Sequence, residues 1–157
     1  MLTLRALGAR LHKPTTKDWP KVDWAVIGSD QPRVVLAHGG CLPPRGYSEP
    51  EALRHLHESI AAAVQENEVT KTLVWSIEGN ARMNNAMRPR LRSEGVVVAA
   101  AAMMGSAVSL VGWQEIAALA DAKHSKDHYV EARDVCGVSV QGADSQAVLA
   151  AIAALAS

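Results

Sequence analysis

The feature that most constrains the fold is the repeated return of short apolar runs, each followed by a polar or glycine-containing stretch and then, in most cases, by a helical pattern. Strands that alternate with helices are typical of a mainly parallel sheet with helices on both faces. We therefore predict a three-layer, doubly wound, flavodoxin-like α/β fold. The strands that support it are expected at 34–37, 72–77, 96–101 and 135–140.

The helices of this pattern are expected between the strands. Ser48 and Glu51 have the spacing of a capping box, and Pro50 lies in the first turn, where its missing N–H costs little. Apolar residues then recur at helical spacing up to about residue 66, so this helix packs one face against the core. Further helices are predicted over 84–92, 107–120 and 145–156.

The N-terminal part departs from the alternation. A short strand is expected over 2–7. Two apolar runs between residues 24 and 38 are separated by about five residues, too few for the crossover that a parallel pair needs. We expect an antiparallel hairpin there, placed before the strand–helix repeats.

Composition narrows the class of protein. A chain of 157 residues with 48% hydrophobic and 20% charged residues predicts a single globular domain spanning 1–157. The formal net charge is zero and the basic residues are scattered in sequence, which argues against a nucleic-acid partner. Cys41 and Cys136 are expected to be free thiols in a reducing, cytoplasmic setting. The uncharged run 96–113 contains glycine and serine and lacks basic flanks, so no membrane span is expected.

Polar residues at the ends of the predicted strands mark a candidate site, because the carboxyl ends of parallel strands border a common crevice. The segment His38-Gly39-Gly40 follows the strand 34–37. Its glycines permit close approach of a ligand, and its imidazole is a candidate acid or base. Arg45 and Tyr47 follow in a loop: arginine binds anions in a fork, and tyrosine is a candidate proton donor.

Two further segments add candidates. Glu78, Asn80 and Arg82 come directly after the strand 72–77 and are predicted to bind substrate. Residues 121–129 are rich in acids and histidines, and His128 is the candidate catalytic residue among them. The spacing lacks an accompanying metal-binding motif, so neither a metal site nor a cofactor is predicted.

Some of these residues resemble those of the type II dehydroquinase family. The similar features are Arg45 and Tyr47, the pair Glu78-Gly79, the apolar run Val96–Ala101 and the pair Gly142-Ala143 before the last helix. The resemblance spans residues 34–157 and implies a flavodoxin-like fold and dehydratase chemistry, although the family's Asn-Pro-Gly-Ala corresponds to Ala99–Ala102. A weaker resemblance to SGNH hydrolases rests on the order of Ser29, Gly39, Asn80 and the Asp121/His124 pair.

Three functional hypotheses follow. The favoured one is a lyase-like enzyme acting on a small polar or anionic molecule, in which Arg45 and Asn80 bind substrate and Tyr47, with His38 or His128, transfers protons. The second is a non-catalytic module that forms homo-oligomers through its alanine-rich helices and the apolar segment 96–120. The third is an esterase-like hydrolase with Ser29 as nucleophile.

Overall fold

The computed structural model describes residues 3–12, 18–76 and 87–157. Its centre is a five-stranded sheet in the order β3-β2-β1-β4-β5. Neighbouring pairs β1–β2 and β2–β3 are antiparallel, whereas β1–β4 and β4–β5 are parallel. All strands except β2 therefore run in the same direction. Their bounds are β1 Arg5–Leu11, β2 Val22–Gly28, β3 Val35–Cys41, β4 Lys71–Trp75 and β5 Ala107–Val111.

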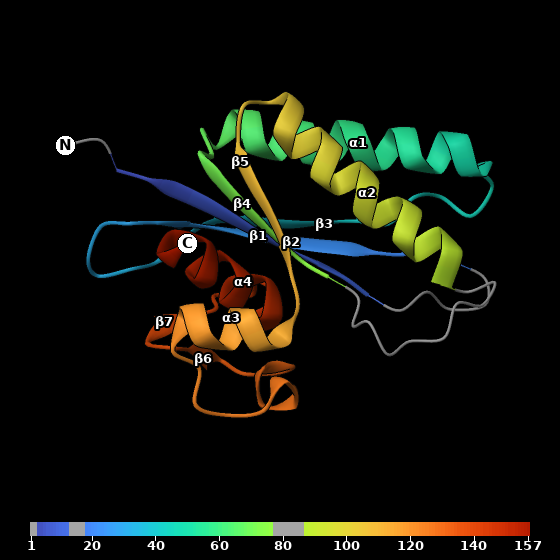
Figure 1. Cartoon of the computed structure of the whole chain (residues 1–157). Coiled ribbons are helices and arrows are strands. Elements are labelled where there is room, and N and C mark those ends of the chain that lie inside the picture. Colours follow the sequence, from blue (N-terminus) through green and yellow to red (C-terminus); the bar gives the residue numbers. More distant parts are fainter. Residues whose placement is uncertain (1–2, 13–17, 77–86) are drawn as a thin grey trace.

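Helices cover both faces of this sheet (Figure 1). On one face lie α1 (Glu49–Glu66) and α2 (Met87–Met103); on the other lie α3 (Trp113–Ala120) and α4 (Ser145–Ala156). A 3-10 turn, η1 (Lys126–Tyr129), and a small hairpin of β6 (Asp134–Val135) and β7 (Val138–Ser139) lie on the α4 side. The α/β architecture, the antiparallel N-terminal hairpin and the capping box at Ser48 are confirmed.

Three segment predictions were wrong. Residues 96–101 belong to the helix α2, and 107–111 form the edge strand β5 rather than the start of a helix. An apolar run without alternation cannot distinguish a buried strand from a buried helix, and the helix predicted over 84–92 continues through Gly95 to Met103. The predicted core strand 135–140 is instead the β6–β7 hairpin, outside the main sheet.

The two faces of the sheet pack against their helices in different ways. The α1/α2 side is filled by large side chains such as Leu11, Leu56 and Ile60. The α4 side receives a helix whose residues from Ser145 to Ala154 are all buried. Small side chains let α4 approach the sheet closely, and it makes its most extensive contact with β1.

Gly8 is the point of closest approach between β1 and α4. A Cβ atom at Gly8 would lie 2.2 Å from both the Ala147 carbonyl oxygen and the Ala151 backbone nitrogen. Only glycine fits there, because both obstructing atoms are backbone atoms that cannot rotate away. The contact fixes the start of α4 beside the carboxyl end of β1.

The structure also bears on the membrane prediction. In the ranges that it describes, no helix combines the length and the apolar character needed to cross a bilayer.

Candidate functional site

Charged side chains emerge on the α4 face where β1 ends. Side chains alternate along a strand, so Gly8 faces α4, and Arg10 and His12 follow on the same side. Directly opposite Arg10 on β2 lies Asp23, and opposite Asp23 on β3 lies Gly40. Asp144, the N-cap of α4, completes the group from the helix.

His12 lies between two carboxylates. Its Nε2 is 2.6 Å from Asp23 Oδ2 and 3.3 Å from Asp144 Oδ2. The contact with Asp144 and then that with Asp23 raise the pKa of His12 to about 9, against the opposing effect of partial burial. At neutral pH the imidazole is therefore a cation shared by the two carboxylates.

Asp144 has a structural role as well as an electrostatic one. Its Oδ1 accepts a hydrogen bond from the backbone N–H of Ala147, 2.9 Å away, which caps α4. Burial opposes the charged form, but the contact with His12, this backbone bond and the charge of Arg10 outweigh it and hold the pKa of Asp144 below its usual value. The carboxylate therefore stays ionised at neutral pH.

Two further basic side chains flank these acids. The guanidinium carbon of Arg10 lies 4.5 Å from the centroid of the buried Trp75 ring, a cation–π contact, and Trp75 stacks in turn on Trp113. Lys21 Nζ lies 3.5 Å from Asp23 Oδ1. We call Arg10, His12, Lys21, Asp23 and Asp144 the β1-end centre.

The absence of a side chain at Gly40 leaves room for the Asp23 carboxylate. A Cβ atom at Gly40 would lie 2.6 Å from Asp23 Oδ1 and 3.2 Å from Cε of Lys21. The flat backbone of β3 thus lets the carboxylate and the lysine stem lie across it.

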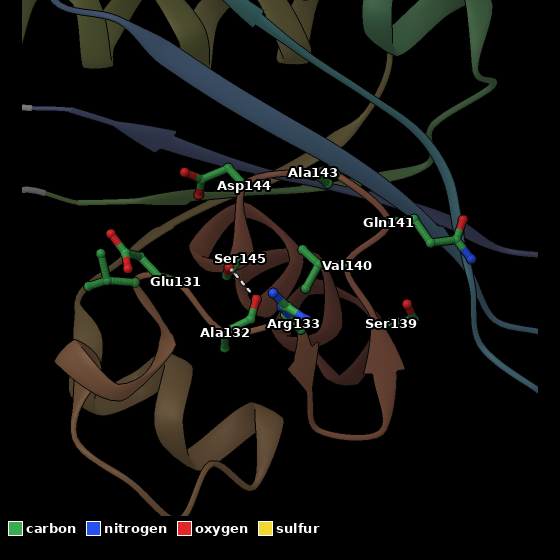
Figure 2. Close-up of a pocket in the computed structure, with 11 residues that line it drawn as sticks. Glu131, Ala132, Arg133, Ser139, Val140, Gln141, Ala143, Asp144 and Ser145 are labelled. Atoms are coloured by element: carbon green, nitrogen blue, oxygen red, sulfur yellow. Dashed lines mark hydrogen bonds between the residues drawn. The ribbon is translucent and has the colours of Figure 1, made fainter.

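A shallow cavity of about 570 Å³ opens next to the centre at Asp144 (Figure 2). Its wall is formed by the segment from Val130 to Arg133 and by the loop from Ser139 to Ser145 that leads into α4. Gln141 and Gly142 in that loop both have left-handed backbone conformations, with φ of 51° and 84°. The cavity extends the polar surface beyond the centre.

The other face contributes at the same end of the sheet. Arg90, near the start of α2, donates a hydrogen bond from Nη2 to the carbonyl oxygen of Leu11, 3.0 Å away. Glu94, one turn further along α2, accepts a hydrogen bond from Ser76 at the end of β4. The arginine-rich start of α2 is thereby joined to the end of β1.

The structure does not bring the predicted catalytic residues together. Tyr47 contacts His55 on α1, ring edge to ring face, with centroids 5.9 Å apart. His128, which lies in η1, stacks on His124, which precedes η1, with ring centroids 4.0 Å apart. His38 lies within β3, opposite Ala25. Among the described residues, no hydrogen bond, ion pair or ring contact joins any two of the three.

The predicted binding residues have mixed positions. Gly39 packs against the Trp24 ring, and Gly40 contacts the β1-end centre as described above. Arg45 forms an ion pair with Asp18, with Nε 2.5 Å from Oδ1. The predicted residues Glu78, Asn80 and Arg82 lie outside the residues that the structure describes.

Sequence reasoning missed the β1-end centre because it ended the first strand at residue 7. The available signal was that Leu7, Ala9 and Leu11 alternate with Gly8, Arg10 and His12, since this continues the strand to Leu11 and puts Arg10 and His12 on the same side of it as Gly8. The pairing of that face with Asp144, more than 130 positions later, has no sequence signature.

Carboxylate and imidazole groups are ligands of divalent cations, so the residue types of the centre make it a candidate metal site. The ligand atoms that His12, Asp23 and Asp144 offer lie within 4.8 Å of one another. The neighbouring Arg10 and Lys21 and the shared proton on His12 do not fit a metal site, because they already neutralise both carboxylates.

Comparison with known proteins identifies the fold. The chain is similar to the structure of RuvC from Thermus thermophilus, with a TM-score of 0.74 and 12% sequence identity, over 98% of this chain and 94% of that one. A second structure, T. thermophilus RuvC in complex with Holliday junction substrate, matches with a TM-score of 0.73 and 14% identity over 98% and 93%. No family model matches the sequence, and no curated protein matches it.

These similarities correct the earlier interpretation. The resemblances to type II dehydroquinases and to SGNH hydrolases were wrong, and so was the flavodoxin-like assignment, because the arrangement of strands is that of RuvC. The hypotheses of a small-molecule lyase and of an esterase fail with them.

The partner predictions also need correction. The non-catalytic oligomeric module was to assemble through alanine-rich helices, but the alanines of α4 are buried in the chain's own core. The prediction of a small-molecule ligand and no nucleic-acid partner is contradicted by the similarity to a RuvC structure that contains a Holliday junction. Basic residues that are scattered in sequence can still gather in the fold: Arg90 donates a hydrogen bond to the carbonyl of Leu11, the residue after Arg10.

Proposed function

We propose that the protein binds branched DNA. The phosphate backbone would lie at the end of the sheet where the central strand β1 ends. The observation that carries the proposal is that two basic segments contribute cations to this end of the sheet: Arg10 and Lys21 flank the acids of the β1-end centre, and Arg90 binds the Leu11 carbonyl. The similarity to RuvC over nearly the whole of both chains supports the choice of branched DNA.

The charge pattern of the two segments favours phosphate contacts. Residues 10–21 contain four basic residues and one acid, and residues 88–92 contain three arginines and no acid. Arg88 and Arg92 are exposed. Neutralisation of phosphates by arginine and lysine releases counterions and provides most of the affinity of proteins for DNA. A zero net charge does not oppose this, because the distribution of charge and not its sum determines the local potential.

At the opposite end of the sheet, where β1 begins, the arginine already has partners. At the start of β1, Arg5 lies 3.5 Å from Glu68 and donates a hydrogen bond to the carbonyl oxygen of Asn67. Glu66 ends α1 on the same side. Arg5 is thus engaged by Glu68 and Asn67, whereas Arg88 is exposed, so we expect DNA to bind where β1 ends and not where it begins.

The test measures fluorescence anisotropy of a labelled four-way junction assembled from synthetic strands, against a linear duplex of equal length. We expect the junction to bind at least about ten-fold more tightly, with an affinity that falls steeply as salt increases. Arg88→Gln is expected to weaken binding and to reduce the salt slope by about one. Arg5→Gln is the matched control and should leave both unchanged.

Either of two results would reject the proposal. One is the absence of junction binding at low salt by the folded wild-type protein. The other is an equal loss of affinity in Arg88→Gln and Arg5→Gln, which would show that DNA binding does not depend on the end of the sheet where β1 ends.

A further inference from the structure

The β1-end centre contains two carboxylates, and both already have cationic partners. Asp23 lies beside Lys21 and faces Arg10 across the β1–β2 pair. Asp144 contacts His12, and the positive charge of Arg10 helps to lower the pKa of Asp144. Arginine remains charged at every accessible pH, so the positive charge of Arg10 cannot be removed by deprotonation.

Arg10 is held where it is by its surroundings. It belongs to the central strand β1, in register with Asp23 on one side and Trp75 on the other. Its guanidinium lies over the buried Trp75 ring. A flexible surface lysine could swing away from an incoming metal ion, whereas a guanidinium stacked on a buried ring inside a sheet is much more restricted.

A divalent cation entering between Asp23 and Asp144 would therefore meet a fixed positive charge. Like charges a few ångströms apart repel strongly in a partly buried site. The phosphate group of a nucleic acid would meet the same guanidinium as a ligand, since its planar fork suits phosphate oxygens.

We infer that Arg10 determines the ion specificity of the β1-end centre: it excludes divalent cations and makes the centre a binding site for a phosphate group. The identification of that phosphate as part of branched DNA rests on the proposed function. The exclusion of divalent cations does not, because it follows from the charges within the chain.

The test is isothermal titration calorimetry with manganese chloride, on the wild type and on two variants at position 10. Arg10→Gln removes the charge and leaves a polar side chain of moderate size, and it is expected to increase Mn²⁺ affinity at least about ten-fold, because the repulsion is lost. Arg10→Lys keeps the charge but loses the stacking that holds it in place, and it is expected to raise Mn²⁺ affinity by a smaller factor than Arg10→Gln does.

Junction binding provides the opposite readout. Arg10→Gln should lose affinity for the four-way junction while it gains affinity for Mn²⁺, a pair of changes that partial unfolding would not produce. Wild-type junction binding should be the same in EDTA and in Mg²⁺. If the wild type does not bind the junction but the Mn²⁺ results hold, the proposed function fails and the cation exclusion stands.

Three results would overturn the inference. They are tight single-site Mn²⁺ binding by the wild type, cleavage of the junction by the wild type in Mn²⁺ that stops when His12 is replaced by alanine, and unchanged Mn²⁺ affinity in a folded Arg10→Gln. If Arg10→Gln fails to fold, Lys21→Gln removes a cation from Asp23 at an exposed position. It should raise Mn²⁺ affinity by a smaller factor, and no rise there would also overturn the inference.

Discussion

The two faces of the sheet are packed by different means, although both are covered by two helices. On the α1/α2 face, large side chains such as Ile60 and Leu56 fill the space between helix and sheet. On the α4 face, helix and strand meet almost backbone to backbone at Gly8, and the helix presents mainly alanines. The first face tolerates small adjustments of its side chains, whereas the contact of Gly8 with α4 has no side chain to adjust.

The difference explains where the charged centre lies. Because α4 is so close to β1, its N-cap Asp144 reaches the end of that strand within contact distance of His12. A helix held away by large side chains would leave the two groups separated by solvent. The close packing at Gly8 and the ion-paired centre beyond it are therefore parts of one arrangement.

The largest expected effect comes from adding one methyl group on the α4 face. Gly8→Ala would force Cβ within 2.2 Å of two backbone atoms of α4, so the helix must move. We expect a loss of more than about 3 kcal/mol in the free energy of unfolding, or failure to fold. Urea denaturation followed by circular dichroism measures it. A loss below about 1 kcal/mol would show that α4 can shift without cost.

The pH dependence of stability tests the centre that this packing creates. The pKa of His12 is raised to about 9 in the folded protein from about 6.5 in an unfolded chain, so its contribution is complete below pH 6.5 and is lost as pH rises through 9. Because the side chain is 36% exposed, solvent screening reduces the expected loss to about 1 to 2 kcal/mol.

The measurement compares urea denaturation of the wild type and of His12→Gln across this pH range. The wild type should lose stability relative to His12→Gln as pH rises from 6.5 to 9.5. His38→Gln, which leaves the His12 contacts intact, should follow the wild type. Parallel curves for the wild type and His12→Gln would contradict the ion pairing.

The corresponding change of one methyl group on the α1/α2 face should matter less. Ile60→Val removes a methyl group from a fully buried position, and we expect a loss of about 1 kcal/mol. The same denaturation experiment provides the comparison with Gly8→Ala. If Ile60→Val destabilises the protein as much as Gly8→Ala does, the two faces are equally intolerant and the contrast fails.

The smallest effect is expected at Gly95, in the exposed part of α2. A Cβ atom there has nothing within 4 Å, so Gly95→Ala should stabilise the protein by about 0.5 to 1 kcal/mol through helix propensity alone. The opposite signs expected for Gly8→Ala and Gly95→Ala separate close packing from backbone entropy. A destabilised Gly95→Ala would show an unrecognised constraint on α2.

The sequence predicts the local elements of this fold better than their assembly. The capping box at Ser48, the helix after Asp144 and the antiparallel pairing of β2 with β3 follow from signals within a few residues. The run 96–101 was assigned to the wrong element, since Val and Ala without alternation suit a buried helix and a buried strand equally well.

The candidate site could be predicted only in part. Gly40 was selected from sequence for the close approach of a ligand, which stays a prediction; in the structure its missing side chain leaves room for the Asp23 carboxylate. The pairing of Arg10 and His12 with Asp144 was not predictable, because it depends on how α4 crosses β1, a contact set by Gly8 and the alanines of α4 over a separation of more than 130 residues.

The ionisation of His12 is the most direct test of the arrangement that α4 imposes at the end of β1. Two-dimensional NMR of the imidazole nitrogens, in the wild type and in Asp144→Asn, follows it residue by residue. We predict a titration midpoint near 9 in the wild type and a clear decrease in Asp144→Asn, which keeps a helix cap but loses the charge. A wild-type midpoint near 6.5, unchanged in the variant, would contradict the account.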